Sequence, residues 1–355
     1  MMTRKKYLSP LTPFFQRLAI LGLLIVFFAD SKPVMATEEI KPEIRVRAAA
    51  VAGSWYPGDA QALGKLVDKL LAEASPQSLP DKGIIRALIT PHAGYQFSGA
   101  GAAAGYKLIQ GQSLRRVIVL GPAHAGGFHG LSIADATHYE TPLGRIPLDL
   151  EAIAQLRENS LVVADDWAHQ REHSIEIQLP LLQRVLAPGW TLLPILVGHI
   201  DDYASAAKLL RPYTDDNTLI VVSGDFTHYG PHYHYIPFPL DGTIKERLKL
   251  LDMGAYEKIA AHDAAGLMAY RDMTSITACA FDPVMLLLHL LPESATSTLV
   301  NYYTSGEVTG DYRHSVSYLT VAVTNELPFS EKAPIVKQKS ANLGGNLNDS
   351  QMQFL

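Results

Sequence analysis

The sequence predicts an α/β protein with a mainly parallel or mixed central sheet and helices on both of its faces. Short, almost continuously apolar runs alternate with longer segments in which apolar residues recur at helical spacing. Strands that are apolar throughout are typical of a sheet covered on both faces. Alternation of such strands with helices is typical of parallel connections. The sequence shows no internal repeat and no heptad pattern, which argues against a solenoid or a coiled coil.

Four apolar runs of strand length are expected to form the core of the sheet. They cover residues 84–90, 116–120, 191–197 and 218–223. Two later runs, near residues 298–304 and 315–323, are expected to complete the sheet.

Helical spacing of apolar residues predicts six helices between and after these strands. They lie around residues 99–110, 149–158, 174–187, 203–212, 244–260 and 279–292. Ser174 or a neighbour is expected to cap the third of them, with Glu176 in its first turn.

The first 36 residues resemble a signal peptide. Lys5, Lys6 and Arg17 are basic, and residues 18–29 form an unbroken apolar run of 12 residues, which is too short to span a bilayer core. The sequence Val-Met-Ala at residues 34–36 predicts cleavage after Ala36 and export, most simply to the periplasm. The alternative is an uncleaved N-terminal membrane anchor.

The remaining chain is expected to contain one domain. Residues 37–47 form a polar leader, residues 48–328 a single α/β domain, and residues 329–355, which lack periodic apolar positions, a disordered tail. About 290 residues can still surround one hydrophobic core.

Charge and cysteine content narrow the class of protein. Residues 1–36 carry five basic residues and one acidic residue, so the chain after Ala36 has 25 basic and 34 acidic residues and a net charge of −9. This acidic balance disfavours nucleic acid and anionic membranes as partners, and we expect no stable membrane insertion after cleavage. Cys279 is the one cysteine, so no intramolecular disulfide can form.

Polar clusters follow three of the predicted strands. His92 follows the first, His124 the second, and Asp225 and His228 the strand that ends at residue 223. Because ligands bind at the carboxyl ends of strands in α/β sheets, we expect His92 and His124 to converge there as metal ligands. The alternatives are histidines that only hydrogen-bond neighbouring loops, and an Asp225 that only caps a helix.

Cys279 opens the last predicted helix, whose dipole favours the thiolate and therefore metal binding. The alternative is an inert, buried thiol. His173 and Glu176, together with Tyr95, are expected in the pocket wall or as partners of the ligands, not as ligands themselves.

Seven ordered motifs resemble the Memo family, whose bacterial members are called AmmeMemoRadiSam system protein B. They are AGSWYPGD from Ala52, TPHAGYQFSG from Thr90, LGPAH from Leu120, EHSIEIQLP from Glu172, PILVG from Pro194, SGDFTHYG from Ser223 and TACAFDP from Thr277.

The resemblance implies the fold of the class III extradiol dioxygenases. It also implies iron or copper held by His92, His124 and Cys279, and a second polar pair, Asp225 and His228, of which His228 stands where the dioxygenases have an acid/base histidine. A link to radical S-adenosylmethionine and AMMECR-type proteins is implied in the same way. Two departures stand out: Ala125 replaces a second consecutive histidine, and the dioxygenases have a carboxylate where this chain has Cys279.

Three functions are compatible with these residues. The first is a redox metalloenzyme with oxygen-dependent, dioxygenase-like chemistry. The second is a module that binds a metal, a small molecule or a peptide without turnover. The third is a zinc hydrolase, because two histidines, a cysteine and water also form a catalytic zinc set.

Overall fold

The computed structural model describes residues 43–79 and 83–330. The expected signal peptide, most of the polar leader and most of the C-terminal tail lie outside these ranges. No helix within the two ranges combines the length and apolar composition needed to cross a bilayer.

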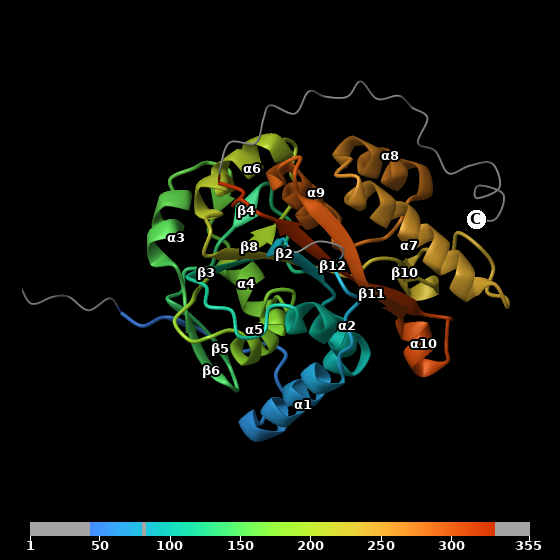
Figure 1. Cartoon of the computed structure of the whole chain (residues 1–355), viewed down its shortest axis with the longest axis horizontal. Coiled ribbons are helices and arrows are strands. Elements are labelled where there is room, and N and C mark those ends of the chain that lie inside the picture. The colour runs from blue at the N-terminus through green and yellow to red at the C-terminus, as the bar shows by residue number, and fades with distance from the viewer. Residues whose placement is uncertain (1–42, 80–82, 331–355) are drawn as a thin grey trace, which may run out of the picture. The chain divides into compact units, whose positions relative to one another are not determined.

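A nine-stranded mixed sheet forms the centre of the domain, and this confirms the predicted α/β class (Figure 1). Its strand order is β10-β12-β2-β9-β3-β8-β4-β7, with β11 paired to β12. The pairs β2–β9, β9–β3 and β3–β8 are parallel, whereas β12 runs antiparallel to β2, and β4 antiparallel to β8. The bounds are β2 Ile84–Thr90, β3 Arg116–Pro122, β4 Leu131–Ser132, β7 Val162–Val163, β8 Thr191–Val197, β9 Thr218–Ser223, β10 His228–Tyr229, β11 Thr296–Thr304 and β12 Ser315–Asn325.

The four parallel strands coincide with the four predicted apolar runs, and β3 extends two residues further, to Pro122. Almost every residue of these strands is buried. Burial on both faces explains why the runs are continuously apolar instead of alternating.

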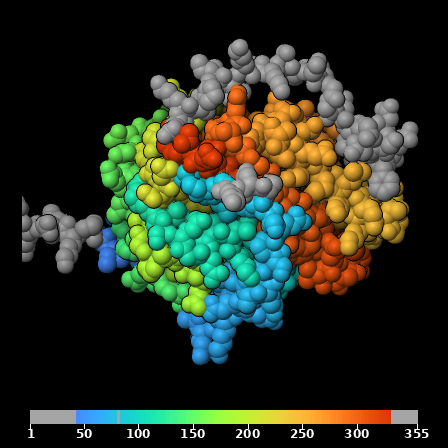
Figure 2. All heavy atoms as spheres, viewed as in Figure 1, coloured from blue at the N-terminus to red at the C-terminus, as the bar shows by residue number. Residues whose placement is uncertain are grey.

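Helices cover both faces of the sheet. On one face α1 (Ala60–Glu73), α2 (Tyr95–Lys107) and α5 (Leu179–Val185) pack together, and α2 lies on β2 and β12. On the other, α9 (Phe281–Leu290) lies on β3 and β9 and packs against α6 (Tyr203–Leu210) and α8 (Ala264–Thr274), which contacts α7 (Ile244–Ala260). Helix α2 also contacts α10 (Ser305–Thr309). Figure 2 shows blue N-terminal and orange C-terminal segments of the described residues side by side on one face.

A second, three-stranded sheet has the strand order β1-β5-β6. The other elements complete the domain: β1 Val46–Arg47, β5 His138–Thr141, β6 Gly144–Pro147, α3 Leu150–Leu156, α4 Asp166–Arg171, and the 3-10 helices Glu176–Gln178, Arg211–Tyr213 and Pro231–Tyr233.

The folded domain extends beyond both predicted boundaries. Arg47, expected in the polar leader, is buried in β1 and forms an ion pair with the buried carboxylate of Glu176. At the other end Phe329 is 2% exposed, and the backbone N–H of Ser330 donates to Thr214. Tertiary contacts that the sequence does not reveal therefore order residues 46–47 and 329–330.

Helix formation in the segment 174–187 starts later than predicted. A 3-10 helix begins at Glu176 and leads into α5, which ends at Val185. Ser174 is not its cap, because the Ser174 hydroxyl donates to the carbonyl of Pro122 at 3.0 Å. Residues 172–175 form a loop whose backbone N–H groups turn toward the Glu172 carboxylate.

Candidate metal centre

The predicted ligands come together at the carboxyl edge of the parallel strands. His92 follows β2, Asp225 follows β9 and His124 follows β3, and these three strands are neighbours in the sheet. The convergence expected from strand order is therefore present. It also brings in a third histidine, His173, from the loop before α5.

A fixed hydrogen-bond network orients His92, whose side chain is buried. Its Nδ1 lies 3.3 Å from Ser223 Oγ. That hydroxyl donates its proton to the carbonyl of Ser174 and accepts a hydrogen bond of 2.8 Å from Gln178 Nε2. Since Ser223 can only accept a further bond, the proton of neutral His92 belongs on Nδ1, and the lone pair of Nε2 stays free.

Glu172 orients His124. The Nδ1 of His124 lies 2.9 Å from Glu172 Oε1, and its backbone N–H donates to Oε2 at 2.6 Å. A carboxylate that accepts the Nδ1 proton leaves Nε2 available and raises its basicity, as in many metal sites. Burial raises the pKa of Glu172, but the hydrogen bond and charge of His124 outweigh this effect and hold the pKa at about 2.

His173 shares the same carboxylate. Its Nδ1 lies 3.4 Å from Glu172 Oε1, and its ring stacks on that of His124 with centroids 4.5 Å apart. Trp55 covers the ring of His173 at a centroid distance of 4.2 Å. Burial, and then the nearby His124, lower the pKa of His173 to about 4, so its imidazole is neutral at physiological pH.

His92, His124 and His173 each offer one ligand atom, and these atoms lie within 4.8 Å of one another. Metal–nitrogen bonds of about 2.0–2.1 Å allow one ion to reach atoms with this separation after small side-chain rotations. The sulfur of Cys279 lies 3.2 Å from Nε2 of His92. The three imidazoles are of a type that transition metals bind, whereas the Cys279 sulfur is not part of this group and is close to His92 alone among the three.

Cys279 precedes α9 instead of opening it, since the helix begins at Phe281. The backbone N–H of Asp225 donates to its sulfur at 3.2 Å. Burial, and then the charge of Asp225, raise the pKa of the thiol well above its ordinary value. Burial thus opposes the thiolate that the helix dipole was expected to favour, and a bound cation would shift this balance toward the thiolate.

Asp225 and His228 lie in the same loop but have different partners. The Asp225 carboxylate accepts the backbone N–H of His92 at 2.8 Å, and burial raises its pKa to about 7. The Nδ1 of His228 lies 2.8 Å from the carbonyl of Thr277, so Thr277, not Asp225, fixes its ring in the described structure. Burial lowers the pKa of His228.

Glu176 and Tyr95 bind backbone groups of the segments around the three histidines. The Glu176 carboxylate pairs with Arg47 and accepts the backbone N–H groups of Ala50 and Val51 at 2.7 and 3.0 Å. Tyr95 donates its hydroxyl proton to the carbonyl of Ile177 at 2.8 Å. Both residues anchor the loops around the histidines.

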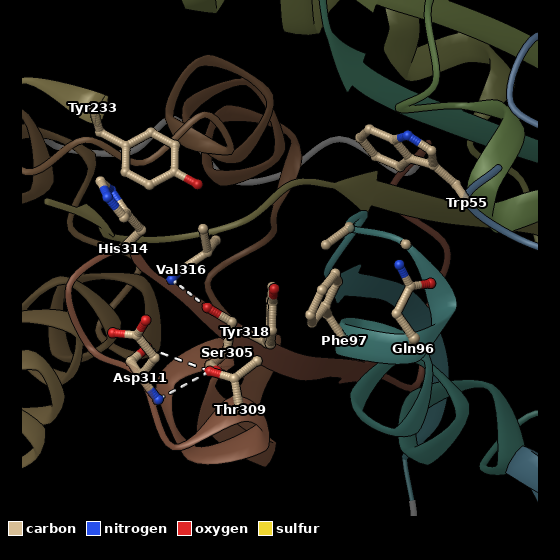
Figure 3. A pocket seen from close by; sticks show the side chains of 12 residues that line it. Trp55, Gln96, Phe97, Tyr233, Ser305, Thr309, Asp311, His314, Val316 and Tyr318 are labelled. Carbon is tan, nitrogen blue, oxygen red and sulfur yellow. Dashed lines mark hydrogen bonds between the residues drawn. The ribbon is translucent and has the colours of Figure 1, made fainter. Parts of the chain in front are cut away.

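A pocket of about 490 Å³ lies next to residues that flank these histidines, although none of the three histidines lines it (Figure 3). Ala93 and Gly94, directly after His92, belong to its wall, as does Trp55, which covers His173. Figure 3 shows Trp55 and Phe97 on one side and Tyr233 and His314 on the other. The ring of Tyr233 also packs against that of His228, with centroids 5.1 Å apart. A ligand in the pocket would therefore contact residues that adjoin His92, His173 and His228.

The family profile described as Memo-like protein matches residues 47–322. The chain belongs to the Memo family. A MEMO1 family protein of Methanopyrus kandleri is 32% identical over 291 residues, which cover 78% of this chain and 98% of that protein. One of Ignicoccus hospitalis is 33% identical, with the same coverage, and a memo-1 homologue of Caenorhabditis elegans is 30% identical over 77% of this chain and 81% of its own.

Membership in the Memo family confirms the resemblance seen in the seven motifs. Residues 47–322 include every donor named above, from His92 to Cys279. Sequence reasoning missed Glu172 as the partner of two histidines and placed His173 only in the surroundings. The dipeptide Glu172-His173 was the available signal in the sequence. It matches no metal-binding motif of known spacing, so it did not indicate which strand end the loop would meet.

Proposed function

We propose that this Memo family protein holds a redox-active iron or copper ion at His92, His124 and Cys279, with His173 as an additional imidazole donor. The observation that carries the proposal is the group of three histidines whose ligand atoms lie within 4.8 Å of one another, with the Cys279 sulfur 3.2 Å from Nε2 of His92. Imidazole and thiolate suit iron, copper and zinc, whereas magnesium and calcium prefer oxygen ligands.

Bound iron or copper would supply electron transfer and activation of oxygen, in dioxygenase-like chemistry. The chain itself supports this role in three ways. Glu172 fixes the imidazole of His124 and lies 3.4 Å from that of His173, the pocket is large enough for a small organic molecule or a peptide side chain, and Trp55 packs on His173.

His228 is the proposed proton carrier. Its Nδ1 proton is committed to the carbonyl of Thr277, which leaves Nε2 to accept or donate a proton. Burial keeps the imidazole neutral at physiological pH, so His228 is ready to accept a proton first. Asp225, whose pKa is about 7, is a second group that can exchange protons near neutrality.

The first experiment is metal analysis of the protein isolated from its native compartment, followed by oxygen consumption after loading with iron or copper. We expect iron or copper near one ion per chain, and oxygen uptake that depends on an added organic substrate. His228→Ala should keep the metal and lose the uptake. Loss of metal in His228→Ala would instead make this residue a ligand, and zinc alone would favour the hydrolase.

A binding module is the second candidate, because the aromatic walls of the pocket suit ligand capture without turnover. Ligand-dependent changes in the spectrum of the bound metal, with neither oxygen uptake nor product, would support it. Export to the periplasm and a link to radical S-adenosylmethionine or AMMECR-type proteins stay predictions from the sequence.

A further inference from the structure

A second group of metal-binding side chains lies on the surface, at the next strand end. His129, His199 and Asp201 each offer one ligand atom, and these atoms lie within 4.8 Å of one another. The Nε2 of His199 is 3.2 Å from Asp201 Oδ1, and the Nδ1 of His129 is 3.7 Å from Oδ2. No part of the proposed function uses these residues.

The backbone holds the two histidines side by side. A parallel β-bridge joins His129 to His199. The N–H of His199 donates to the carbonyl of Phe128 at 3.0 Å, and the N–H of Gly130 donates to the carbonyl of His199 at 2.8 Å. Their rings meet edge to face with centroids 5.1 Å apart. The pairing is therefore built by main-chain hydrogen bonds and does not depend on chance contact of two long side chains.

Glycines make this close approach feasible. A Cβ on Gly198 would lie 2.3 Å from the carbonyl oxygen of Phe128. A Cβ on Gly130, whose φ is +87°, would lie 2.2 Å from the carbonyl oxygen of Leu161. A side chain at position 198 would push apart the segments that carry His129 and His199, and one at position 130 would push the His129 segment away from Leu161.

The donor set indicates the class of ion. Two imidazoles and a carboxylate suit zinc, nickel or copper(II), whereas calcium and magnesium require oxygen ligands. The site has no sulfur, so it is less suited to copper(I) than the site at Cys279. The three side chains are 64–80% exposed, so water can complete the coordination shell and little desolvation opposes binding.

We propose that His129, His199 and Asp201 form a second, surface site for a divalent transition-metal ion such as zinc. His199 follows β8, the neighbour of β3, and His129 ends the loop after β3 that also carries His124. An ion at the second site therefore cross-links the loop after β3 to the loop after β8. The chain would then hold a second ion, and this ion would restrain the loop after β3, which also carries His124.

The test is zinc binding by the full chain after removal of all metal. Isothermal titration calorimetry gives affinities, and zinc retained after equilibrium dialysis gives stoichiometry. His199→Ala and His129→Ala, which act from opposite sides of the bridge, are each expected to bind one zinc ion fewer than the wild type. Asp201→Asn is expected to lower the affinity for that zinc ion by at least about tenfold. Even residues that only hydrogen-bond to metal ligands have an effect of this size.

Two further variants separate this site from the first. His234→Asn is the matched control, because His234 is exposed and has a φ of 53°, which asparagine tolerates. It should bind zinc as the wild type does. Cys279→Ser should keep the ion that His199→Ala loses, whether or not the first site takes zinc. Equal zinc content in wild type, His129→Ala and His199→Ala, with unchanged thermal unfolding, overturns the proposal.

Discussion

Cys279 is the residue whose chemistry depends most on its surroundings. Its sulfur lies between Nε2 of His92 and the backbone of Asp225, in a site where burial opposes ionisation. A metal ion reverses this balance, because a coordinated thiol loses its proton. Under the proposed function, we therefore expect the same side chain to be inert without metal and a strong ligand with it.

Cys279→Ser should lower the affinity for copper by at least about tenfold and leave thermal unfolding of the metal-free protein almost unchanged. A serine hydroxyl fits the space but does not ionise to a soft ligand. Copper affinity measured by competition with a chelator tests the effect. An inert packing role for Cys279 predicts the opposite, a loss of stability with unchanged copper affinity.

His169 gives the protein a defined sensitivity to acid. Burial lowers its pKa to about 4, and its Nδ1 pairs with the Tyr139 hydroxyl at 2.8 Å. The unfolded chain takes up the proton below its ordinary pKa of about 6.5, so stability is full above that pH and falls as the pH drops toward 4. The loss over this window is about 3 kcal/mol.

His169→Gln should remove this part of the acid sensitivity, because glutamine keeps an acceptor for Tyr139 but has no ionisable group. The measurement is the free energy of unfolding of the metal-free protein in urea between pH 7 and pH 4. The control is His234→Asn, at an exposed position. A pH dependence identical in His169→Gln and wild type would rule out His169 as its source.

At the scale of elements, the contact between two loops sets the distance between Asp225 and Cys279. A Cβ on Gly224, directly after β9, would lie 2.5 Å from the Cα of Ala280, directly before α9. The backbones of the two segments therefore touch at Gly224 and Ala280. Asp225 directly follows the first of these residues, and Cys279 directly precedes the second. Space, not backbone conformation, requires glycine here.

Gly224→Ala should lower the free energy of unfolding by about 1–3 kcal/mol, since the loop after β9 must move away from Ala280. The movement separates Asp225 from Cys279, so metal affinity should fall as well. Urea unfolding and metal titration measure both effects. Gly242→Ala, at a glycine with no atom within 4 Å of the added Cβ, should change neither. Wild-type metal affinity in Gly224→Ala would show that the contact does not position the site.

The elements that sequence predicted best are those whose residues all share one environment. The strands β2, β8 and β9 were predicted to the residue because burial on both faces leaves an almost continuous apolar run. Helix α1 was missed, although Asp59 caps it and Leu63, Val67 and Leu71 recur at a spacing of four. The pairing of β1 with β5 joins segments about 90 residues apart, and no local pattern reports it.

For the candidate site, strand order was enough to bring His92 and His124 together, but not to find their partners. His173 and Glu172 reach the edge of the sheet through the loop between α4 and the following 3-10 helix, whose direction depends on packing. The role of Thr277 was equally hidden. Its carbonyl group holds the His228 ring, and its hydroxyl accepts from the N–H of His228 and donates to the His228 carbonyl, but residues 49 positions apart share no local pattern.

At the scale of the whole molecule, the described residues form one domain from β1 to the segment around Phe329, and the comparisons place it in the Memo family. The predicted export signal lies outside the described residues. Whether this signal directs export matters for function, because the compartment determines which metals and partners are available to the protein.

Export predicts a mature chain that begins at Thr37 and is recovered from the periplasmic fraction. The physical basis is the apolar run of 12 residues and the small residues at positions 34 and 36. Mass spectrometry of the N-terminal peptide after cell fractionation measures it. Full-length chain in the membrane fraction would identify the alternative, an uncleaved anchor, and full-length chain in the cytosol would exclude both.

The close pair of Cys279 and His92 joins residues 187 positions apart in the chain. The two side chains cannot meet until the chain has been synthesised past Cys279, so an incomplete chain lacks this pair. A chain that crosses a membrane unfolded would arrive without its metal. The compartment in which folding finishes, rather than the one in which the ribosome works, would then decide which ion the site captures.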